Sequence, residues 1–330
     1  MLAAVAGPLA LAPCPASARA ADLAGAQQRA ALDLDRLREA HERDPASVKA
    51  TLEYVRALIR ASRDESARPL LYTLLQNPAS LQPAEAAEAF FHMGGVHLQA
   101  GEDYEAVACW RTVLRDYRAS ERASSAAINA AVVLFRGLND AGQAFNLLTE
   151  CTRDGTIKSP QTELANFLIF EIYVDRRSYT EARGLLGSLP TGSEHYGAIR
   201  NLVPVVYWKT GDEAKARVLV DARFEEVKDD LIGLNNLAAV LAEHGLDLDR
   251  ALACAERALR LSDGRRHYVW DTYADLLFRT GQIAKAIDAE EKAVALATSE
   301  RVRHEYRARL QTYRAAAIGK RRPTSEVQHE

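Results

Sequence analysis

The chain has 330 residues, of which 48% are hydrophobic and only 7% aromatic. It is rich in alanine, leucine, arginine and glutamate, which favour helices, and it lacks the alternating β-branched runs that form strands, so the sequence predicts an all-α fold. The 42 basic and 45 acidic side chains are interspersed and give a net charge of −3. A charge balance of this kind argues against nucleic acid as a partner, because it creates no extended basic surface.

The first 20 residues form an apolar segment rich in small residues that ends in Ala18-Arg19-Ala20. This pattern resembles a secretory signal with an A-x-A cleavage site, although no basic residue precedes the apolar run. We therefore expect an exported chain, periplasmic or secreted, with no transmembrane span once residues 1–20 are removed. A lipid anchor at Cys14 is the weaker alternative, because Pro13 stands where a lipobox has a small residue.

Three cysteines remain after residue 20, namely Cys109, Cys151 and Cys254. None belongs to a CxxC pair or alternates with histidine at a spacing suited to metal ligands, so no metal site is expected. The simplest interpretation is that all three are small buried hydrophobic residues.

Residues 21–47 predict a helical N-terminal cap or half repeat that ends at Asp44-Pro45, since proline does not continue a helix. Further along, two consecutive stretches within residues 231–297 repeat one pattern. Trp270, Ala274, Leu277, Gly281, Ala286 and Ala293 have the same spacings as Leu234, Ala238, Leu241, Gly245, Ala251 and Ala258, apart from one residue inserted after Gly245.

On these residues the chain resembles the tetratricopeptide repeat (TPR) family. The resemblance implies a right-handed superhelical solenoid of antiparallel helix pairs in which each repeat completes its core against its neighbours. The alanine in the middle of each repeat indicates about seven repeats within residues 48–298: Ala67, Ala106, Ala144, Ala182, Ala216, Ala251 and Ala286.

The repeats match the family pattern unequally. Gly94 occupies the position where the two helices of a repeat approach most closely, and Asn139-Asp140 and Arg177 replace the turn glycine of the third and fourth repeats. Pro204 falls in the middle of an expected helix, where it is predicted to kink it. Asp247-Leu248-Asp249 is expected to be a widened repeat turn, because the glycine and glutamate of a calcium loop are absent.

Residues 299–318 predict an amphipathic C-terminal capping helix with Val302, Tyr306, Leu310 and Tyr313 on one stripe. Residues 319–330 have no apolar stripe and are predicted to be disordered.

The sequence contains no phosphate-binding glycine loop, HExxH motif or nucleophile elbow, and His92 and His97 lie about 140° apart on a helix. We therefore expect no catalytic residue, cofactor or metal.

In the TPR family the first helix of each repeat lines a concave groove. Carried over by position, the fifth residues of these helices are Leu52, Phe91, Asn129, Phe167, Asn201, Asn235 and Asp271, and the sixth residue of one is Asn236. An asparagine amide has both a donor and an acceptor for the backbone of a bound peptide. The predicted partner-binding residues are Asn129, Asn201, Asn235, Asn236, Asp271, Asp275, Phe278 and Arg279. Nearby groove positions are Arg56, Arg60, His92, Arg136, Glu171, Asp175, Trp208 and Lys209.

These residues have a second interpretation, in which the aromatics pack between repeats and the asparagines cap contacts between helices. The function predicted from the sequence is a non-catalytic scaffold that binds a protein or peptide segment in this groove, in a cell-envelope assembly. A structural or self-assembling module acting through its outer surface and terminal helices, and hence a homo-oligomer, is the alternative. An enzyme or small-ligand receptor on the same scaffold is the third hypothesis.

Overall fold

The computed structural model describes residues 32–321 and divides into two compact units between Arg176 and Arg177, which we call the first and second units. The described residues form helices and no strands. The signal segment predicted for residues 1–20, the start of the N-terminal cap and residues 322–330 of the predicted tail lie outside the described residues.

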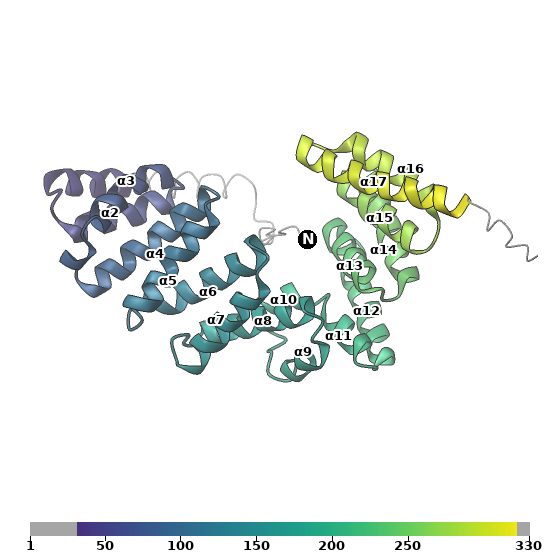
Figure 1. Ribbon diagram of the computed structural model, residues 1–330, viewed down its shortest axis with the longest axis horizontal. Coiled ribbons are helices and arrows are strands. Elements are labelled where there is room, and N and C mark those ends of the chain that lie inside the picture. Colours follow the sequence, from purple (N-terminus) through teal and green to yellow (C-terminus); the bar gives the residue numbers. More distant parts are fainter. Residues whose placement is uncertain (1–31, 322–330) are drawn as a thin grey trace, which may run out of the picture. The chain divides into compact units, whose positions relative to one another are not determined.

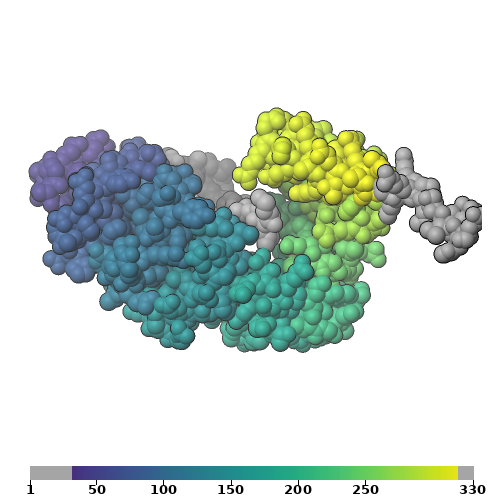
Figure 2. All heavy atoms as spheres, viewed as in Figure 1, coloured from purple at the N-terminus to yellow at the C-terminus, as the bar shows by residue number. Residues whose placement is uncertain are grey.

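The first unit begins with a helix over residues 32–43 and continues as consecutive helices that lie side by side (Figure 1). Its helices are α2 (Val48–Arg60), α3 (Asp64–Leu75), α4 (Pro83–Gln99), α5 (Asp103–Asp116), α6 (Arg122–Val132), α7 (Ala141–Arg153) and α8 (Gln161–Asp175). A 3₁₀ turn, η1 (Pro78–Ser80), follows α3, and a π-helical segment, η2 (Val133–Gly137), continues α6. In the space-filling view, side chains close the gaps between neighbouring helices (Figure 2).

The second unit follows the same plan. Its helices are α9 (Tyr179–Leu185), α10 (Tyr196–Ile199), α11 (Val203–Lys209), α12 (Glu213–Val227), α13 (Leu231–His244), α14 (Leu248–Leu261), α15 (His267–Arg279), α16 (Ile283–Leu296) and α17 (Glu300–Arg321). In both units a first helix packs on the second helix of its own repeat and on the next repeat. The prediction of an all-α solenoid of helix pairs is thereby confirmed.

The mid-repeat alanines set the distance between paired helices. Each is fully buried, with 0% of its surface exposed: Ala67, Ala106, Ala144, Ala182, Ala216, Ala251 and Ala286. A larger side chain at these points would push the paired helices apart, because packed interiors have no spare volume. The spacing between these alanines in the sequence therefore corresponds to the spacing between successive helix pairs in the structure.

The turn between the two helices of each repeat passes through the left-handed region near the end of the first helix. The residues concerned are Ser62, Gly101, Asn139, Arg177, Gly211, Gly245 and Gly281, with φ between 54° and 87°. Glycine adopts this conformation without a Cβ clash, whereas Arg177 does so at a steric cost. Asp247, with φ of 43°, also lies in this region and caps α14 by accepting a hydrogen bond from the Arg250 backbone N–H. Three residues separate α13 from α14, as between α15 and α16, so the predicted widening of this turn is not seen between the helix ends.

Gly94 allows α4 and α5 to approach closely, as the sequence predicts. A Cβ at Gly94 would lie 2.5 Å from Nε1 of Trp110 on α5. That indole is 1% exposed and donates to the Phe91 carbonyl across a distance of 3.1 Å, so it is held on both its apolar and its polar side.

The kink predicted at Pro204 is wrong. The expected helix is already interrupted, because α10 ends at Ile199 and α11 begins at Val203. Pro204 therefore lies in the first turn of α11, where a missing N–H breaks no helical hydrogen bond. The consequence is a short first helix in the fifth repeat rather than a bent one.

The C-terminal helix α17 packs on α16, and Tyr306 and Tyr313 of α17 contact His267 and Phe278 of α15. Three members of the predicted stripe, Tyr306, Leu310 and Tyr313, are 5%, 7% and 2% exposed. The helix continues to Arg321, beyond its predicted end at residue 318, so residues 319–321 are helical rather than disordered. At the other end of the chain, Leu34 is buried against α2 and α3, which places the residue 32–43 helix as a cap on the first repeat.

Candidate functional site

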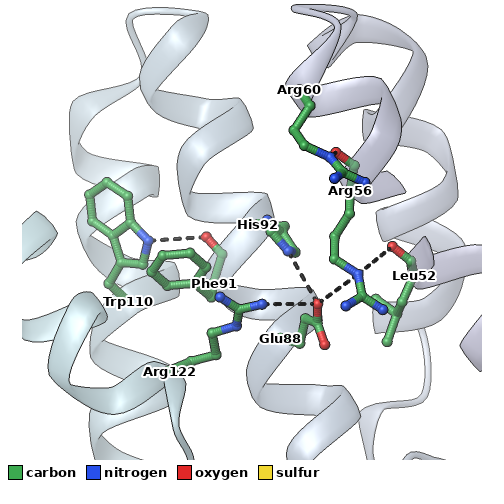
Figure 3. A network of polar contacts seen from close by, with 8 residues as sticks. All are labelled: Leu52, Arg56, Arg60, Glu88, Phe91, His92, Trp110 and Arg122. Atoms are coloured by element: carbon green, nitrogen blue, oxygen red, sulfur yellow. Dashed lines mark hydrogen bonds and ion pairs between the residues drawn. The ribbon is translucent and has the colours of Figure 1, made fainter. Parts of the chain in front are cut away.

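In the first unit, an ion cluster joins the first helices of three consecutive repeats. Glu88 on α4 lies 3.2 Å from Arg56 Nε on α2 and 3.2 Å from an Arg122 guanidinium nitrogen on α6 (Figure 3). His92 Nε2 lies 3.4 Å from the same Glu88 oxygen. The His92 side chain, followed by Arg56 and Arg122, holds the pKa of the Glu88 carboxyl below its ordinary value against the opposing effect of burial.

The cluster is open to solvent on its cationic side. The Arg56 and Arg122 side chains are 40% and 36% exposed, whereas that of Glu88 is 17% exposed. The Arg122 guanidinium also lies over the Phe91 ring, 5.3 Å from its centroid (Figure 3). The surface thus combines a carboxylate, two guanidinium groups and an aromatic ring, which together can hydrogen-bond and pack against a peptide.

Two members of this cluster were missed by the sequence analysis. Glu88 occupies the second position of its first helix, one of the family's inward-facing positions, and that signal was sufficient to find it. Arg122 precedes the first of the repeat positions that were assigned to the groove. It reaches Glu88 only because α6 packs beside α4. No sequence spacing indicated that contact.

The other predicted residues of the first unit are distributed along the same helices. Asn129 is half-buried on α6. Arg136 on η2 donates to Glu171 on α8 across 2.6 Å, which again joins two first helices.

In the second unit the predicted asparagines have different environments. Asn201, in the turn between α10 and α11, accepts a hydrogen bond from Arg223 Nε of α12 at 2.9 Å, so its amide joins that turn to α12. Asn235 on α13 is 8% exposed, and its Oδ1 has no hydrogen-bond partner among the described residues. Asn236 is half-buried beside it.

The predicted residues on α15 are partly covered by the C-terminal helix. Asp271 forms an ion pair with Arg309 of α17, and the Phe278 ring stacks on Tyr313 of α17 with centroids 4.5 Å apart. Asp275 and Arg279 pair with each other along α15 at 2.7 Å. For Asn201, Asp271 and Phe278 the structure therefore shows contacts within the chain, in line with the second interpretation of the sequence.

A cavity of about 340 Å³ lies next to Arg279 in the second unit. Its lining includes Arg177, Lys209 and Glu243, together with Tyr179 and His244, whose Oη and Nδ1 atoms lie 3.4 Å apart. Lys209 and Arg279 end α11 and α15, where they offset the partial negative charge of the helix C-termini. Among the lining residues, Arg177, Lys209 and Arg279 are cationic and Glu243 is anionic, so the side chains around the cavity have a positive net charge.

Within residues 32–321, no group of three or more His, Cys, Asp or Glu side chains is arranged to hold a metal ion. Burial raises the pKa of the Cys109 thiol to about 11 and that of Cys254 to about 12, and it also raises the pKa of Cys151. These thiols are protonated at neutral pH and have no nucleophilic activation. In the described part of the chain, every helix is too short or too polar to cross a bilayer.

No family model and no curated protein matches the sequence. Among solved structures, the chain is similar to a tetratricopeptide repeat protein from Parabacteroides merdae, with a TM-score of 0.60, 15% identity, and coverage of 80% of this chain and 98% of that one. It is also similar to a chain of the APC/C hetero-tetramer Cut9-Hcn1 (TM-score 0.47, 16% identity, 84% and 52% coverage) and to yeast Tom70 (TM-score 0.44, 13% identity, 88% and 60% coverage). It thus spans about half and three fifths of the latter two chains. Together with the buried alanines and left-handed turns, the similarity of nearly the whole Parabacteroides protein shows that this chain has the tetratricopeptide-repeat fold.

Proposed function

We propose that the chain is a non-catalytic scaffold that binds a segment of a partner protein along the first helices of its repeats. The observation that carries this proposal is the Glu88 cluster, in which α2, α4 and α6 contribute side chains to one continuous polar surface. A segment lying across these helices would contact three repeats at once. A contact surface formed by three adjacent helices suits a partner segment that is extended or helical.

The chemistry of this surface suits a peptide backbone. Arg56 and Arg122 donate hydrogen bonds that backbone carbonyls accept, the Glu88 carboxylate accepts from backbone N–H groups, and Phe91 offers an apolar surface. Asn129, Asn235, Asn236 and Arg279 remain predicted contacts of the same kind. An export signal in residues 1–20 and a role in a cell-envelope assembly belong to this proposal on sequence grounds alone.

A second candidate function uses the outer surface instead. Tyr72 on α3 and Tyr104 on α5 are 52% and 75% exposed, and they lie on the second helices of consecutive repeats. Exposed tyrosines are common anchors of protein interfaces. This observation favours a module that docks or self-associates through its second helices.

Site-specific photocrosslinking distinguishes the two functions. Benzoyl-phenylalanine is placed at Phe91 or at Tyr104 of the full chain, which is then irradiated in a whole-cell extract and in isolation. We expect partner adducts from position 91 and none from position 104. Adducts from position 104 only, or a crosslinked dimer of the purified chain, would favour the outer-surface function.

The matched variants test whether the cluster itself makes the contact. Arg56→Gln with Arg122→Gln is expected to reduce the yield of position 91 adducts about 2- to 30-fold, because each of the two exposed charged contacts contributes about 0.2–1 kcal/mol. The control is Arg115→Gln, an exposed arginine on the second helix α5 that pairs with its neighbour Asp116. Equal adduct yields from the double variant and the control would remove the Glu88 cluster from the interface.

A further inference from the structure

A fully buried glutamate lies between the last repeat and the C-terminal helix. Glu290 on α16 is 0% exposed, and neither of its carboxyl oxygens accepts from a hydrogen-bond donor among the described residues. It meets the Asp271 carboxyl, with which it can share a hydrogen bond only when one of the two acids is protonated. A carboxylate in such a place would lack both water and donors, so its neutral form is favoured. This glutamate takes no part in the proposed partner surface.

The groups that face Glu290 come from two further helices. They are Asp271 and Asp275 on α15 and Tyr306, Arg309 and Tyr313 on α17. We call Glu290, Asp271, Asp275 and Arg309 the carboxyl cluster. It holds three acidic groups and one guanidinium, and the guanidinium is already paired with Asp271.

Burial, followed by the proximity of Asp271, raises the pKa of Glu290 from 4.5 to about 8, although Arg309 opposes this shift. Burial likewise raises the pKa of Asp271. The cluster is therefore protonated at one carboxyl near neutral pH.

The helix α17 supplies much of this burial. Its Tyr306, Leu310 and Tyr313 are almost fully buried against the last repeat, and Tyr306 Oη lies 2.8 Å from His267 Nδ1. Tyr313 covers Phe278, and its own hydroxyl is buried without a hydrogen-bond partner. Detachment of α17 would give Glu290 access to water, where an ionised carboxylate is stable.

We propose that Glu290 is a proton-controlled latch: α17 stays docked on α15 and α16 while Glu290 is protonated and is released when it ionises. Release would uncover Asp271 and Phe278, two residues that the sequence predicts to contact a partner. The latch is a property of the isolated chain and holds whether or not the proposed function is correct.

The direction of the pH dependence follows from linkage. Docking raises the pKa of Glu290 from its ordinary value of 4.5 to about 8, so docking takes up a proton between these values. The stabilisation is complete below pH 4.5 and is lost as the pH rises toward 8. The docking equilibrium should weaken about tenfold per pH unit in this window and level off above it.

Amide hydrogen exchange of the full chain measures docking directly. The readout is the protection of α17 amides relative to α13 amides in the same molecule, corrected for intrinsic exchange, at pH 5.5, 6.5 and 7.5. In the wild type we expect this ratio to fall about tenfold per unit. Glu290→Gln is a permanent mimic of the protonated acid and should lose this fall with rising pH. Any slope that remains should have the opposite sign, because burial lowers the pKa of His267, which contacts Tyr306 of α17, so docking weakens as His267 becomes protonated.

The matched control is Glu291→Gln, because Glu291 is the adjacent residue and forms a solvent-exposed ion pair with Arg314 of α17. It should keep the slope of the wild type. A flat profile in the wild type, or an equal slope in Glu290→Gln, would overturn the latch.

A measurement on the wild type alone covers the case in which Glu290→Gln does not fold. With glutamate labelled at its side-chain carboxyl carbon, the NMR titration should show one carboxyl that changes near pH 8, well above the others. If every glutamate carboxyl titrated near its ordinary value, the proposal would be wrong.

Discussion

The contact of one glycine with one indole fixes how closely α4 and α5 pack. Gly94→Ala would place a methyl group 2.5 Å from Trp110 Nε1, and the ring is held by its burial and by its bond to Phe91. We expect a loss of about 1–3 kcal/mol in the free energy of unfolding, typical of overpacking. Urea denaturation followed by circular dichroism measures it.

Gly95 provides the matched control, since a Cβ there would meet nothing within 4 Å. Gly95→Ala should stabilise the chain by about 0.5–1 kcal/mol, because alanine favours helix more than glycine does. Equal effects of the two substitutions would mean that helix propensity, and not the close approach, governs this site.

Individual residues also show the limit of reading a site from sequence. The positions of Gly94 and the mid-repeat alanines were predictable, because the repeat spacing fixes which residues face the paired helix. The surroundings of Asn201 and Phe278 were not, because they depend on Arg223 and Tyr313, which approach from other helices. The position of a residue within its repeat predicts the direction of its side chain, but it does not predict which residues of other helices cover that side chain.

At the scale of elements, the turns hold strain that the helices do not. Arg177 has φ of 60° at a turn where Gly211, Gly245 and Gly281 serve in later repeats. Arg177→Gly is therefore expected to stabilise the chain by about 1 kcal/mol, since a side chain in the left-handed region costs about 1–2 kcal/mol and the entropy of glycine offsets part of the gain. Thermal or urea unfolding measures the change.

Arg177→Ala separates the backbone from the side chain, because alanine keeps the Cβ and loses the guanidinium. It should give no stabilisation, and Gly281→Ala, at φ of 80°, should destabilise by about 1 kcal/mol or more. If Arg177→Ala stabilised the chain as much as Arg177→Gly, the arginine side chain and not the backbone would be the source of the strain.

At the scale of the whole molecule, stability is expected to be local. Packing in a repeat array is mainly between neighbours, and the described chain divides into two compact units. Gly94→Ala should lower hydrogen-exchange protection in α4–α6 but leave α13–α16 unchanged. In Gly233→Ala on α13, the added Cβ would lie 2.8 Å from Val227 Cγ1. This variant should lower protection in α13–α16 and leave that of α4–α6 unchanged.

Hydrogen exchange under native conditions, read helix by helix, checks this pair of variants. Each one serves as the control for the other, since both add a methyl group to a crowded helical glycine. An equal loss of protection in both units from either variant would show that the array unfolds as a single cooperative body.

The sequence by itself determined the fold class, the period of the repeats and the positions of the buried alanines, turns and capping helix. It could do so because the two helices that pair lie within the same repeat of about 34 residues, so the spacing of small and large residues along that short stretch specifies the pairing. The tertiary structure alone decided that Arg122 reaches Glu88, that α17 covers Asp271 and Phe278, and that Glu290 is cut off from water. These outcomes depend on desolvation and on contacts between different helices, and no spacing along the chain specifies them.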